Sequence, residues 1–593
     1  MNEAGIEHHA QIDARRLVLR QRIEALPLFQ TLDDSALAAL CEEIEWFSLP
    51  GGWTLFKEGE AGDATFFVLS GRLGAVTIGP DGEESLLGQI SAGEVVGEMA
   101  LVLGEPRSAT VVALRDSELL RLSRETFGHL VDRSLRAQRF LIEILARRLR
   151  SASHRPAFEE APRTLAIVPL SPEMAAGRFA RELAAELQRL GRRICQLGAD
   201  ACGRDSEWFL RVEERNDLVL YQADWAASAW TKLCLRQADR VLLVASGSAC
   251  AAIDDEAIGS MLRAKRPGTV ELVVVHRDEP LSPGLTGGLL ERHKAGFHCH
   301  LREGRQADIA RLARLLTGRA VGVVLSGGGA RGFAHLGALR ALNEAGVPLD
   351  LFAGASMGSI IGALAALEWG EAEMLERMIP AFVESNPLGD YTLPFVALAR
   401  GRKLSQRIRR HFGDVAIEEC WRHFFCTAAD LTTGRVRVFR SGPLWKALRA
   451  SVAIPGVVMP VIENGHVLVD GGVLNNMPID LLLAMRRGPV IAVNVTRQPI
   501  WAKADDLEDQ RLWNLMNPKR RGAPHIVEIL MRTGSVGSDA QIGAFRSRVD
   551  LFIEPPLQDI GMLDWKAYKK AIEGGYRYTA ELLDKSKFSL PGN

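Results

Sequence analysis

The stretch VVLSGGGARGFAHLG, residues 323–337, decides the fold of the last third of the chain. An apolar run typical of a buried strand comes first, three glycines follow it, and a helical pattern begins after them. A glycine loop between a strand and a helix leaves backbone N–H groups free at the start of the helix, where they suit any anion. The stretch therefore predicts the first strand–loop–helix unit of a parallel α/β sheet that runs to PVIAVNV, residues 489–495.

Two kinds of ligand fit such a loop. Gly327, Gly329 and Gly332 match the dinucleotide pattern G-x-G-x-x-G, but no clear acidic residue at the end of the next strand supports binding of a ribose. The same amides would serve equally well as an oxyanion hole, in which fixed N–H groups stabilise the negative charge that develops on a carbonyl oxygen.

The next strand–helix unit favours the oxyanion hole. FAGASMGSIIGAL, residues 352–364, places Ser356 between Gly354 and Gly358, and Gly-x-Ser-x-Gly is the pattern of a nucleophile elbow. From the glycine loop to Ser356 there is room for one helix and one strand. Since consecutive units of a parallel sheet end at the same edge, we expect the loop and Ser356 to lie side by side.

A serine nucleophile needs a base, and the histidines after the elbow, at 411, 423, 466 and 525, lie in no obvious motif. His466 is expected on a hairpin strand. Asp470 stands in VLVDGGVLNNMP, residues 467–478, at the end of a strand and before two glycines. Burial of a carboxylate in such a turn raises its pKa and makes it a better base. The alternative for Asp470 is an ordinary turn aspartate.

These motifs carry a resemblance. SGGGARG, GASMG and DGG, together with LRASVAIPGVV at 448–458, resemble the patatin-like phospholipase family. The resemblance implies a catalytic dyad of Ser356 and Asp470 without a histidine, and hydrolysis of lipid acyl esters through an acyl-enzyme, with no metal and no catalytic cofactor. It also implies that Gly327, Gly328 and Gly329 form an oxyanion hole and that Arg331 completes the motif.

The first part of the chain has a different pattern of predicted elements. Between residues 26 and 150, short β-rich pieces separated by glycine turns predict an antiparallel β-barrel or jelly roll, followed by a helix. Within it, VGEMALVLGEPRSATVVA at 96–113 holds Glu98 and Arg107 around a short helix start. A cyclic nucleotide needs a carboxylate for its ribose 2′-OH, and a guanidinium and backbone amides for its phosphate.

This stretch resembles the phosphate-binding cassette of cyclic nucleotide-binding domains. The resemblance assigns the ribose to Glu98 and the phosphate to Arg107, and it makes cAMP or cGMP the expected regulatory ligand. The nucleotide-contacting residues that it implies are Gly97, Glu98, Arg107, Ser108 and Ala109. The alternative is a domain retained for packing or localisation that binds no nucleotide.

The region 163–318 alternates apolar strands with amphipathic helices, which predicts a Rossmann-like parallel α/β domain. Its first loop, in VPLSPEMAAG at 168–177, lacks the G-x-x-x-x-G-K-[ST] of a phosphate loop, so we expect no nucleotide hydrolysis. Together with the hydrolase part, the region resembles neuropathy target esterase-like proteins, which join cyclic nucleotide-binding domains to a patatin-like domain. The chain departs from that pattern in having one clear nucleotide module and no N-terminal membrane helix.

The chain thus reads as a multidomain α/β protein: a β-barrel or jelly-roll domain, a Rossmann-like domain and a patatin-like α/β hydrolase domain. The predicted parts are an N-terminal extension (1–25), the cyclic nucleotide-binding domain (26–150), a linker (151–162), the Rossmann-like domain (163–318), the hydrolase domain (319–500) and a C-terminal extension packed on it (501–593).

Composition excludes several functions. The 593 residues carry 72 basic and 73 acidic side chains, for a net charge of −1, which argues against a nucleic-acid-binding protein. The eight cysteines form no C-x-x-C pair, which suits free thiols in a reducing compartment. The triplet His298-Cys299-His300 has no second pair of metal ligands to match it, so no metal site is expected.

The N-terminus has no apolar core of a signal peptide, and the long uncharged run between Asp350 and Glu368 is the elbow itself. We therefore expect a cytoplasmic protein with peripheral contact at the inner face of the membrane. The segment 384–411, apolar first and then with six Arg or Lys residues, is typical of an interfacial lid or anchor. The alternative for that segment is a core helix with a solvated basic face.

The leading prediction is a serine esterase that hydrolyses lysophospholipids or phospholipids and is regulated by a cyclic nucleotide. One alternative is a general lipase or small-ester esterase. The other is a non-catalytic scaffold that responds to a cyclic nucleotide.

Overall fold

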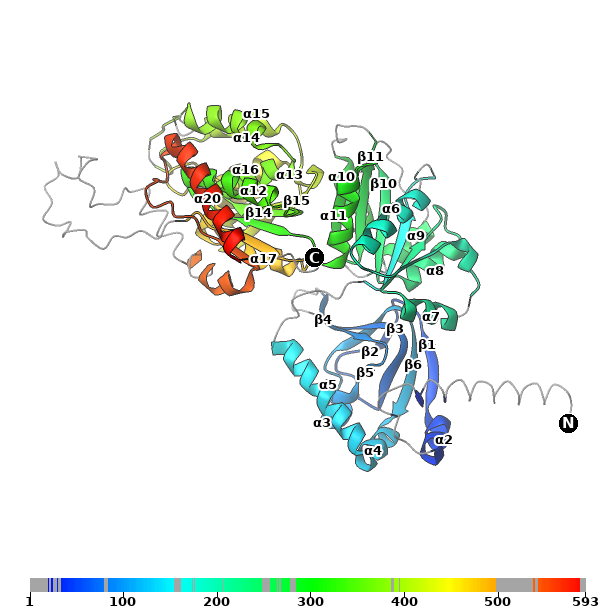
Figure 1. Ribbon diagram of the computed structural model, residues 1–593. Coiled ribbons are helices and arrows are strands. Elements are labelled where there is room, and N and C mark those ends of the chain that lie inside the picture. The colour runs from blue at the N-terminus through cyan, green and yellow to red at the C-terminus, as the bar shows by residue number, and fades with distance from the viewer. Residues whose placement is uncertain are drawn as a thin grey trace, which may run out of the picture.

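The computed structural model describes residues 20, 23–24, 29 and 34–586, apart from 79–83, 154–161, 173, 175, 205, 248–255, 264, 266–267, 278–283, 386–388, 394, 497–536 and 539–541. The described chain is built on three β-sheets that follow one another in sequence (Figure 1). The β-rich first domain lies below the two α/β domains in the view of Figure 1.

The first domain is an antiparallel sheet, as predicted, in the order β1-β6-β3-β4, with β2 on β6 and β5 on β3. Along β6 every second residue is buried, as expected of a strand with one face on a core. Its strands are β1 (Glu45–Leu49), β2 (Thr54–Phe56), β3 (Ala64–Ile78), β4 (Glu84–Ser91), β5 (Val95–Val96) and β6 (Thr110–Ser123). Its helices are α2 (Asp34–Glu43), α3 (Glu98–Leu103), α4 (Arg124–Arg133) and α5 (Leu135–Ser153), and α5 extends into the predicted linker.

The middle domain has a fully parallel sheet in the order β12-β11-β10-β7-β9-β8, which confirms the predicted fold class. Five of its strands are buried along nearly their whole length, as in a sheet covered by helices on both faces, whereas the edge strand β8 is largely half-buried or exposed. Its strands are β7 (Thr164–Pro169), β8 (Ile194–Leu197), β9 (Leu218–Gln222), β10 (Arg240–Ser246), β11 (Val270–His276) and β12 (Phe297–Arg302). Its helices are α6 (Ala176–Arg189), α7 (Ser206–Arg215), α8 (Ala229–Gln237), α9 (Glu256–Arg263), α10 (Leu285–His293) and α11 (Gln306–Thr317).

The third sheet runs in the order β17-β18-β15-β14-β13-β19-β20, with β16 on the side of β15. Strands β15, β14, β13, β19 and β20 are parallel, whereas β16 and β18 pair with β15 in the antiparallel sense. Its strands are β13 (Gly322–Leu325), β14 (Leu351–Ala355), β15 (His423–Asp430), β16 (Arg435–Phe439), β17 (Val461–Glu463), β18 (His466–Asp470), β19 (Val490–Val493) and β20 (Leu551–Ile553).

The helices of this domain position the site. They are α12 (Ala334–Glu344), α13 (Met357–Ala366), α14 (Glu371–Met378), α15 (Arg402–Phe412), α16 (Leu444–Ser451), α17 (Ile479–Ala484) and α20 (Tyr568–Ser586). Helix α20 crosses α12 so closely that a Cβ on Gly337 would lie 1.9 Å from the carbonyl oxygen of Ile572. The C-terminal helix therefore packs on the helix that follows the glycine loop, and only a glycine allows that approach.

Candidate active site

Ser356 lies at a sharp turn between β14 and α13, with φ 50° and ψ −127°. A positive φ is rare for a residue with a side chain, and here it lifts the hydroxyl out of the helix start. The flanking glycines are required by space: a Cβ on Gly354 would lie 2.6 Å from the carbonyl carbon of Gly358, and a Cβ on Gly358 would lie 2.2 Å from the oxygen of Leu325.

Asp470 ends β18, and its side chain is fully buried. Its Oδ1 accepts a hydrogen bond from the N–H of Gly472 at 2.8 Å. Burial raises the pKa of Asp470 to about 6, against the smaller lowering effects of the Gly472 amide and the Ser356 hydroxyl. Oδ2 is buried without a hydrogen bond of ordinary geometry among the described residues, so the Ser356–Asp470 contact is loose, as catalytic contacts often are before substrate binds.

The glycine loop lies against the elbow, since a Cβ on Gly327 would approach the Cβ of Ser356 to 2.9 Å. The amide of Gly327 is occupied, because it donates to Oδ1 of Asn476 at 3.1 Å. The amides of Gly328 and Gly329 make no hydrogen bond within the described part of the chain. Arg331 is buried, and its Nε donates to the carbonyl of Gly328 at 3.4 Å, which ties it to the loop.

Two further side chains support the site and were not singled out from the sequence. The hydroxyl of Ser451 accepts the N–H of Ser356 at 2.9 Å and donates to the carbonyl of Thr427 at 2.8 Å. Asn476 holds the loop through Gly327, as described above. The signal for both was present: Ser451 belongs to LRASVAIPGVV, and Asn476 follows DGG in VLVDGGVLNNMP.

Within the described chain, no histidine is hydrogen-bonded to Ser356. His466 lies on β18, paired with β17 as predicted, and its Nδ1 is 2.8 Å from Oδ2 of Asp430. His423 is half-buried and stacks on Phe297, with ring centroids 4.7 Å apart, and both of its ring nitrogens are buried. His335 bonds the carbonyl of Ser326 at 2.8 Å. His525 lies outside the described residues.

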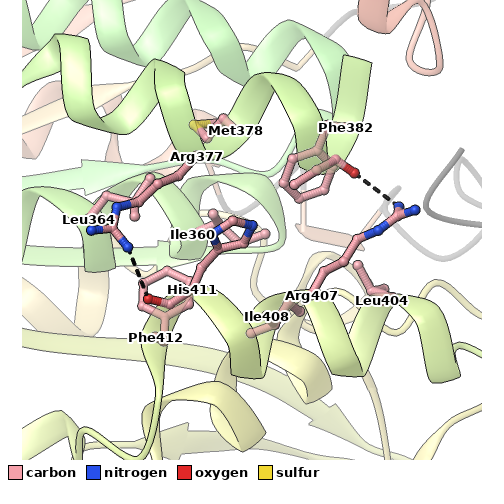
Figure 2. A pocket seen from close by; sticks show the side chains of 11 residues that line it. Ile360, Leu364, Arg377, Met378, Phe382, Leu404, Arg407, Ile408, His411 and Phe412 are labelled. Carbon is pink, nitrogen blue, oxygen red and sulfur yellow. Dashed lines mark hydrogen bonds between the residues drawn. The ribbon is translucent and has the colours of Figure 1, made fainter. Parts of the chain in front are cut away.

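An apolar pocket lies along the elbow helix, between α13, the α14 segment and α15 (Figure 2). The empty space among its lining atoms, with the open solvent at its mouth included, amounts to about 380 Å³. Ile360, one turn after Ser356, and Leu364 form its floor, and Arg377, Arg407 and His411 are its polar lining residues. Ser356 and Asp470 do not line it, so the pocket adjoins the chemistry without containing it.

The proposed nucleotide residues gather at the start of α3. Arg107 is buried and donates to the carbonyls of Gly97 at 2.9 Å and Ala64 at 2.8 Å, with its guanidinium 4.2 Å from the ring centre of Phe56. Gly97 has φ 86°, and a Cβ there would lie 2.3 Å from the Arg107 guanidinium.

Glu98 is also buried, and its charge helps to offset the lowering effect of burial on the pKa of Arg107. Ser108 is exposed and Ala109 is buried. The structure therefore brings the glycine, the carboxylate and the guanidinium together, although Arg107 is bound to backbone carbonyls.

No three side chains of the metal-ligating types cluster among the described residues. The triplet His298-Cys299-His300 forms part of β12 and is buried. None of the helices in the described ranges is both long and apolar enough to cross a bilayer.

Comparison with protein families defines three domains. Residues 46–134 match a cyclic nucleotide-binding domain, residues 162–303 match the P-loop-like domain of the neuropathy target esterase family, and residues 323–483 match the patatin-like phospholipases. The three resemblances drawn from the sequence motifs are thereby confirmed.

An uncharacterized NTE family protein of Mycobacterium tuberculosis is 31% identical over 94% of this chain and 95% of its own length. The human patatin-like phospholipase domain-containing protein 6 is 31% identical over 90% of this chain and 44% of its own, and Lysophospholipase NTE1 of Yarrowia lipolytica is 28% identical over 93% and 46%. The chain belongs to the NTE family. It spans less than half the length of the human and yeast relatives.

Proposed function

We propose that this chain is a serine carboxylic ester hydrolase that cleaves acyl esters of lysophospholipids or phospholipids. One observation carries the proposal: a serine with positive φ at a strand–helix turn lies beside a fully buried carboxylate whose pKa is raised to about 6. The names of two relatives, a phospholipase domain-containing protein and a lysophospholipase, support the substrate class.

In the proposed mechanism, Asp470 accepts the proton of the Ser356 hydroxyl as its oxygen attacks the ester carbonyl carbon. The amides of Gly328 and Gly329 stabilise the oxyanion. The amide of Gly327 can donate to the oxyanion only if its hydrogen bond to Asn476 breaks. The absence of a side chain at Gly327 also allows the loop to approach Ser356. The protonated Asp470 gives its proton to the leaving alcohol. Water, deprotonated by Asp470, then hydrolyses the acyl-enzyme.

Arg331 has a supporting role in this proposal, because its side chain bonds the loop carbonyl of Gly328. The apolar pocket beside α13 is the proposed site for the acyl chain, since Ile360 connects it to the elbow within one helical turn.

The full chain with Ser356→Ala and with Asp470→Asn tests the dyad against lysophosphatidylcholine and a water-soluble short-chain ester. We expect Ser356→Ala to abolish acyl release from both, and Asp470→Asn to lower kcat by a factor on the order of 10³. His466→Ala is the matched control and should retain activity, because His466 faces Asp430 on the exposed hairpin. Acyl release that survives Ser356→Ala would sink the assignment.

A panel of substrates separates the alternatives. Faster hydrolysis of triacylglycerol or short esters than of lysophospholipid indicates a general lipase or esterase. A folded protein inactive on every ester indicates the scaffold.

For the first domain we propose that a cyclic nucleotide binds through Glu98 and Arg107, with Gly97, Ser108 and Ala109 beside the phosphate, and changes the rate of hydrolysis. The arrangement of Arg107 supports the site, and it requires that the phosphate replace the carbonyls of Gly97 and Ala64.

Calorimetry with cAMP and with cGMP tests this proposal. A heat of binding that is lost in the Arg107→Ala variant supports the proposal. The control is Arg178→Ala, which changes an exposed arginine of the middle domain. The absence of heat with both nucleotides would leave the domain a structural role.

A further inference from the structure

Large apolar side chains gather on the outside of one loop of the hydrolase domain, formed by residues 391–393 and 395–398. They are between 40% and 88% exposed, with Phe395 the most exposed. The set comprises Tyr391, Leu393, Phe395, Val396 and Leu398. Single exposed apolar residues are ordinary on a protein surface, but five within one short loop form a patch that marks an interaction site.

The loop is firmly attached to the domain. Leu398 and Ala399 donate their N–H groups to the carbonyls of Gly456 and Val457, at 3.0 and 2.9 Å. The small side chains of Ala397 and Ala399 point inward and are buried, whereas the large ones of Val396 and Leu398 point outward. A segment that only packs against the domain would place its large side chains inside, so this alternation favours contact with another apolar surface.

Helix α15 begins directly after the loop and is strongly amphipathic. Leu404, Ile408 and Phe412 are buried and line the apolar pocket. The opposite side is exposed and basic, because residues 402, 403, 409 and 410 fall within about one third of the helical circumference at 100° per residue. These residues are Arg402, Lys403, Arg409 and Arg410.

Few acids neutralise this basic face. Arg409 lies 3.3 Å from Asp414, whereas the side chains of Arg402 and Arg410 form no ion pair with a described residue. Asp390 caps the helix, since it accepts the N–H of Arg402 at 2.6 Å, and Glu384 is exposed nearby in sequence. The surface therefore combines an apolar tip with a net positive charge, the combination that favours anionic phospholipids.

We propose that the apolar loop and the basic face of α15 form one surface that docks on an anionic phospholipid bilayer. The loop side chains enter the boundary of the acyl chains, and the arginines contact the headgroup phosphates. This proposal rests on the proposed lipid hydrolysis, because docking on a bilayer brings the enzyme to its substrate. Because α15 has its other face on the apolar pocket, docking brings the bilayer next to the proposed acyl-chain site (Figure 2).

A second copy of this chain fits the surface less well. A two-fold symmetric contact would bring the same patch from each copy together, and the arginines of one α15 would then face those of the other. Like charges at close range oppose such a contact, whereas a bilayer with anionic lipids attracts them.

Vesicle sedimentation tests the docking with the full-length Ser356→Ala protein, which leaves the lipid intact. The vesicles are phosphatidylcholine alone or phosphatidylcholine with phosphatidylserine. We expect preferential binding to the second kind, weakened by added salt. Phe395→Glu should lower the partition coefficient about tenfold or more. Arg402→Glu with Arg410→Glu should lower it by roughly fivefold for each unit of charge changed.

Two matched controls change residues outside the surface. Trp53→Glu alters a similarly exposed aromatic residue of the first domain, and Lys585→Glu alters an exposed base on α20. Both should bind vesicles as well as the parent protein does. Equal losses in the controls, or unchanged binding in the loop and helix variants, would overturn the proposal.

The outcome is separable from that of the proposed function. With Ser356 intact, Phe395→Glu should lower the ratio of vesicle-lipid hydrolysis to soluble-ester hydrolysis. If neither ester is hydrolysed but Phe395-dependent vesicle binding is found, only the proposed function fails. A dimer that Phe395→Glu dissociates, without any vesicle binding, would overturn the lipid assignment in favour of self-association.

Discussion

Arg115 of the first domain donates a 2.8 Å hydrogen bond to Glu213 of the middle domain, and both side chains are buried. Asp239 adds a second carboxylate, 3.5 Å from Arg115 and 3.4 Å from Arg72. Burial raises the pKa of Glu213, whereas at Asp239 the two arginines and backbone amides outweigh burial and lower the pKa. The first domain is therefore joined to the middle domain by paired charges in its own strands β3 and β6, beyond the covalent linker.

Arg115→Ala should weaken this junction strongly. The substitution leaves Glu213 buried without its partner, and breaking a buried pair in this way typically costs about 3–5 kcal/mol. We expect the first domain to unfold in a separate transition at lower temperature in differential scanning calorimetry. Arg236→Ala is the control, because its pair with Asp116 is exposed and should contribute about 1 kcal/mol or less. Superimposable melting curves for the two variants would show that the buried charges do not join the domains.

The pKa of Asp470 predicts the pH dependence of activity. Only the ionised carboxylate accepts the proton of Ser356, so kcat/KM should rise as the pH increases toward about 6 and level off above it. Below that pH, each unit should lower kcat/KM about tenfold. A pH–rate profile with a soluble ester checks this, and a flat profile between pH 5 and 7 would contradict a base of this pKa.

The same shift predicts an opposite effect on stability. The folded pKa of about 6 is above the ordinary 3.8, so the contribution of Asp470 to stability is present at low pH and is lost as the pH rises through 6. A shift of about two units corresponds to roughly 3 kcal/mol. Asp470→Asn should therefore be strongly impaired in catalysis yet more stable than the parent at pH 8, and urea unfolding at pH 8 and pH 4 measures the difference. A variant less stable at pH 8 would contradict the buried, ionised carboxylate.

The nucleophile elbow was predictable from the sequence because its geometry depends on residues close to Ser356 in the sequence. Gly354 and Gly358 are needed within a few residues of Ser356, and the Gly-Gly turn holds Asp470 locally. The bond between the Gly327 amide and Asn476 was not predictable, because it joins positions 149 residues apart. The bond between Arg115 and Glu213, 98 residues apart, was not predictable either. A charged residue in an amphipathic helix, such as Glu213, is expected to face solvent, but here its side chain contacts the first domain.

A cluster of three buried histidines and the half-buried His423 lies between the middle and hydrolase domains. His276 and His300 are 2.9 Å apart through their ring nitrogens, and His300 also contacts the carbonyl of Glu418 at 2.8 Å. His298 adjoins His423, with ring centroids 5.3 Å apart. Burial lowers the pKa of His276 to about 4 and of His298 and His423 to about 3, and it lowers that of His300 as well. The charged groups that act on the cluster are Arg302, Asp308, Arg311, Arg440 and Arg487.

Mild acid should therefore destabilise this junction. A histidine that is neutral when folded and has an ordinary pKa of 6.5 when unfolded loses its contribution to stability as the pH falls below 6.5, by roughly 2 kcal/mol at pH 5. His423→Phe keeps the stacking on Phe297 and breaks no hydrogen bond, since neither ring nitrogen of His423 has a partner among the described residues. The variant should gain about 2 kcal/mol over the parent between pH 7.5 and pH 5, measured by urea unfolding. An identical pH dependence in His423→Phe and the parent would contradict a neutral His423 ring in the folded protein.

The apolar pocket should set the preferred acyl-chain length. Ala381 is buried and lines the pocket, and the Nη1 group of the Arg407 side chain donates to its carbonyl at 3.1 Å, which fixes the backbone there. Ala381→Phe would fill the hollow that the distal part of a long acyl chain is proposed to occupy. Each excluded methylene removes about 0.8 kcal/mol of binding, so exclusion of four should lower kcat/KM for a long-chain lysophospholipid by a factor on the order of 100.

The measured quantity is the ratio of long-chain to short-chain ester hydrolysis, because overpacking also destabilises the fold by about 1–3 kcal/mol and would lower both rates together. A ratio unchanged from the parent would place the acyl chain elsewhere.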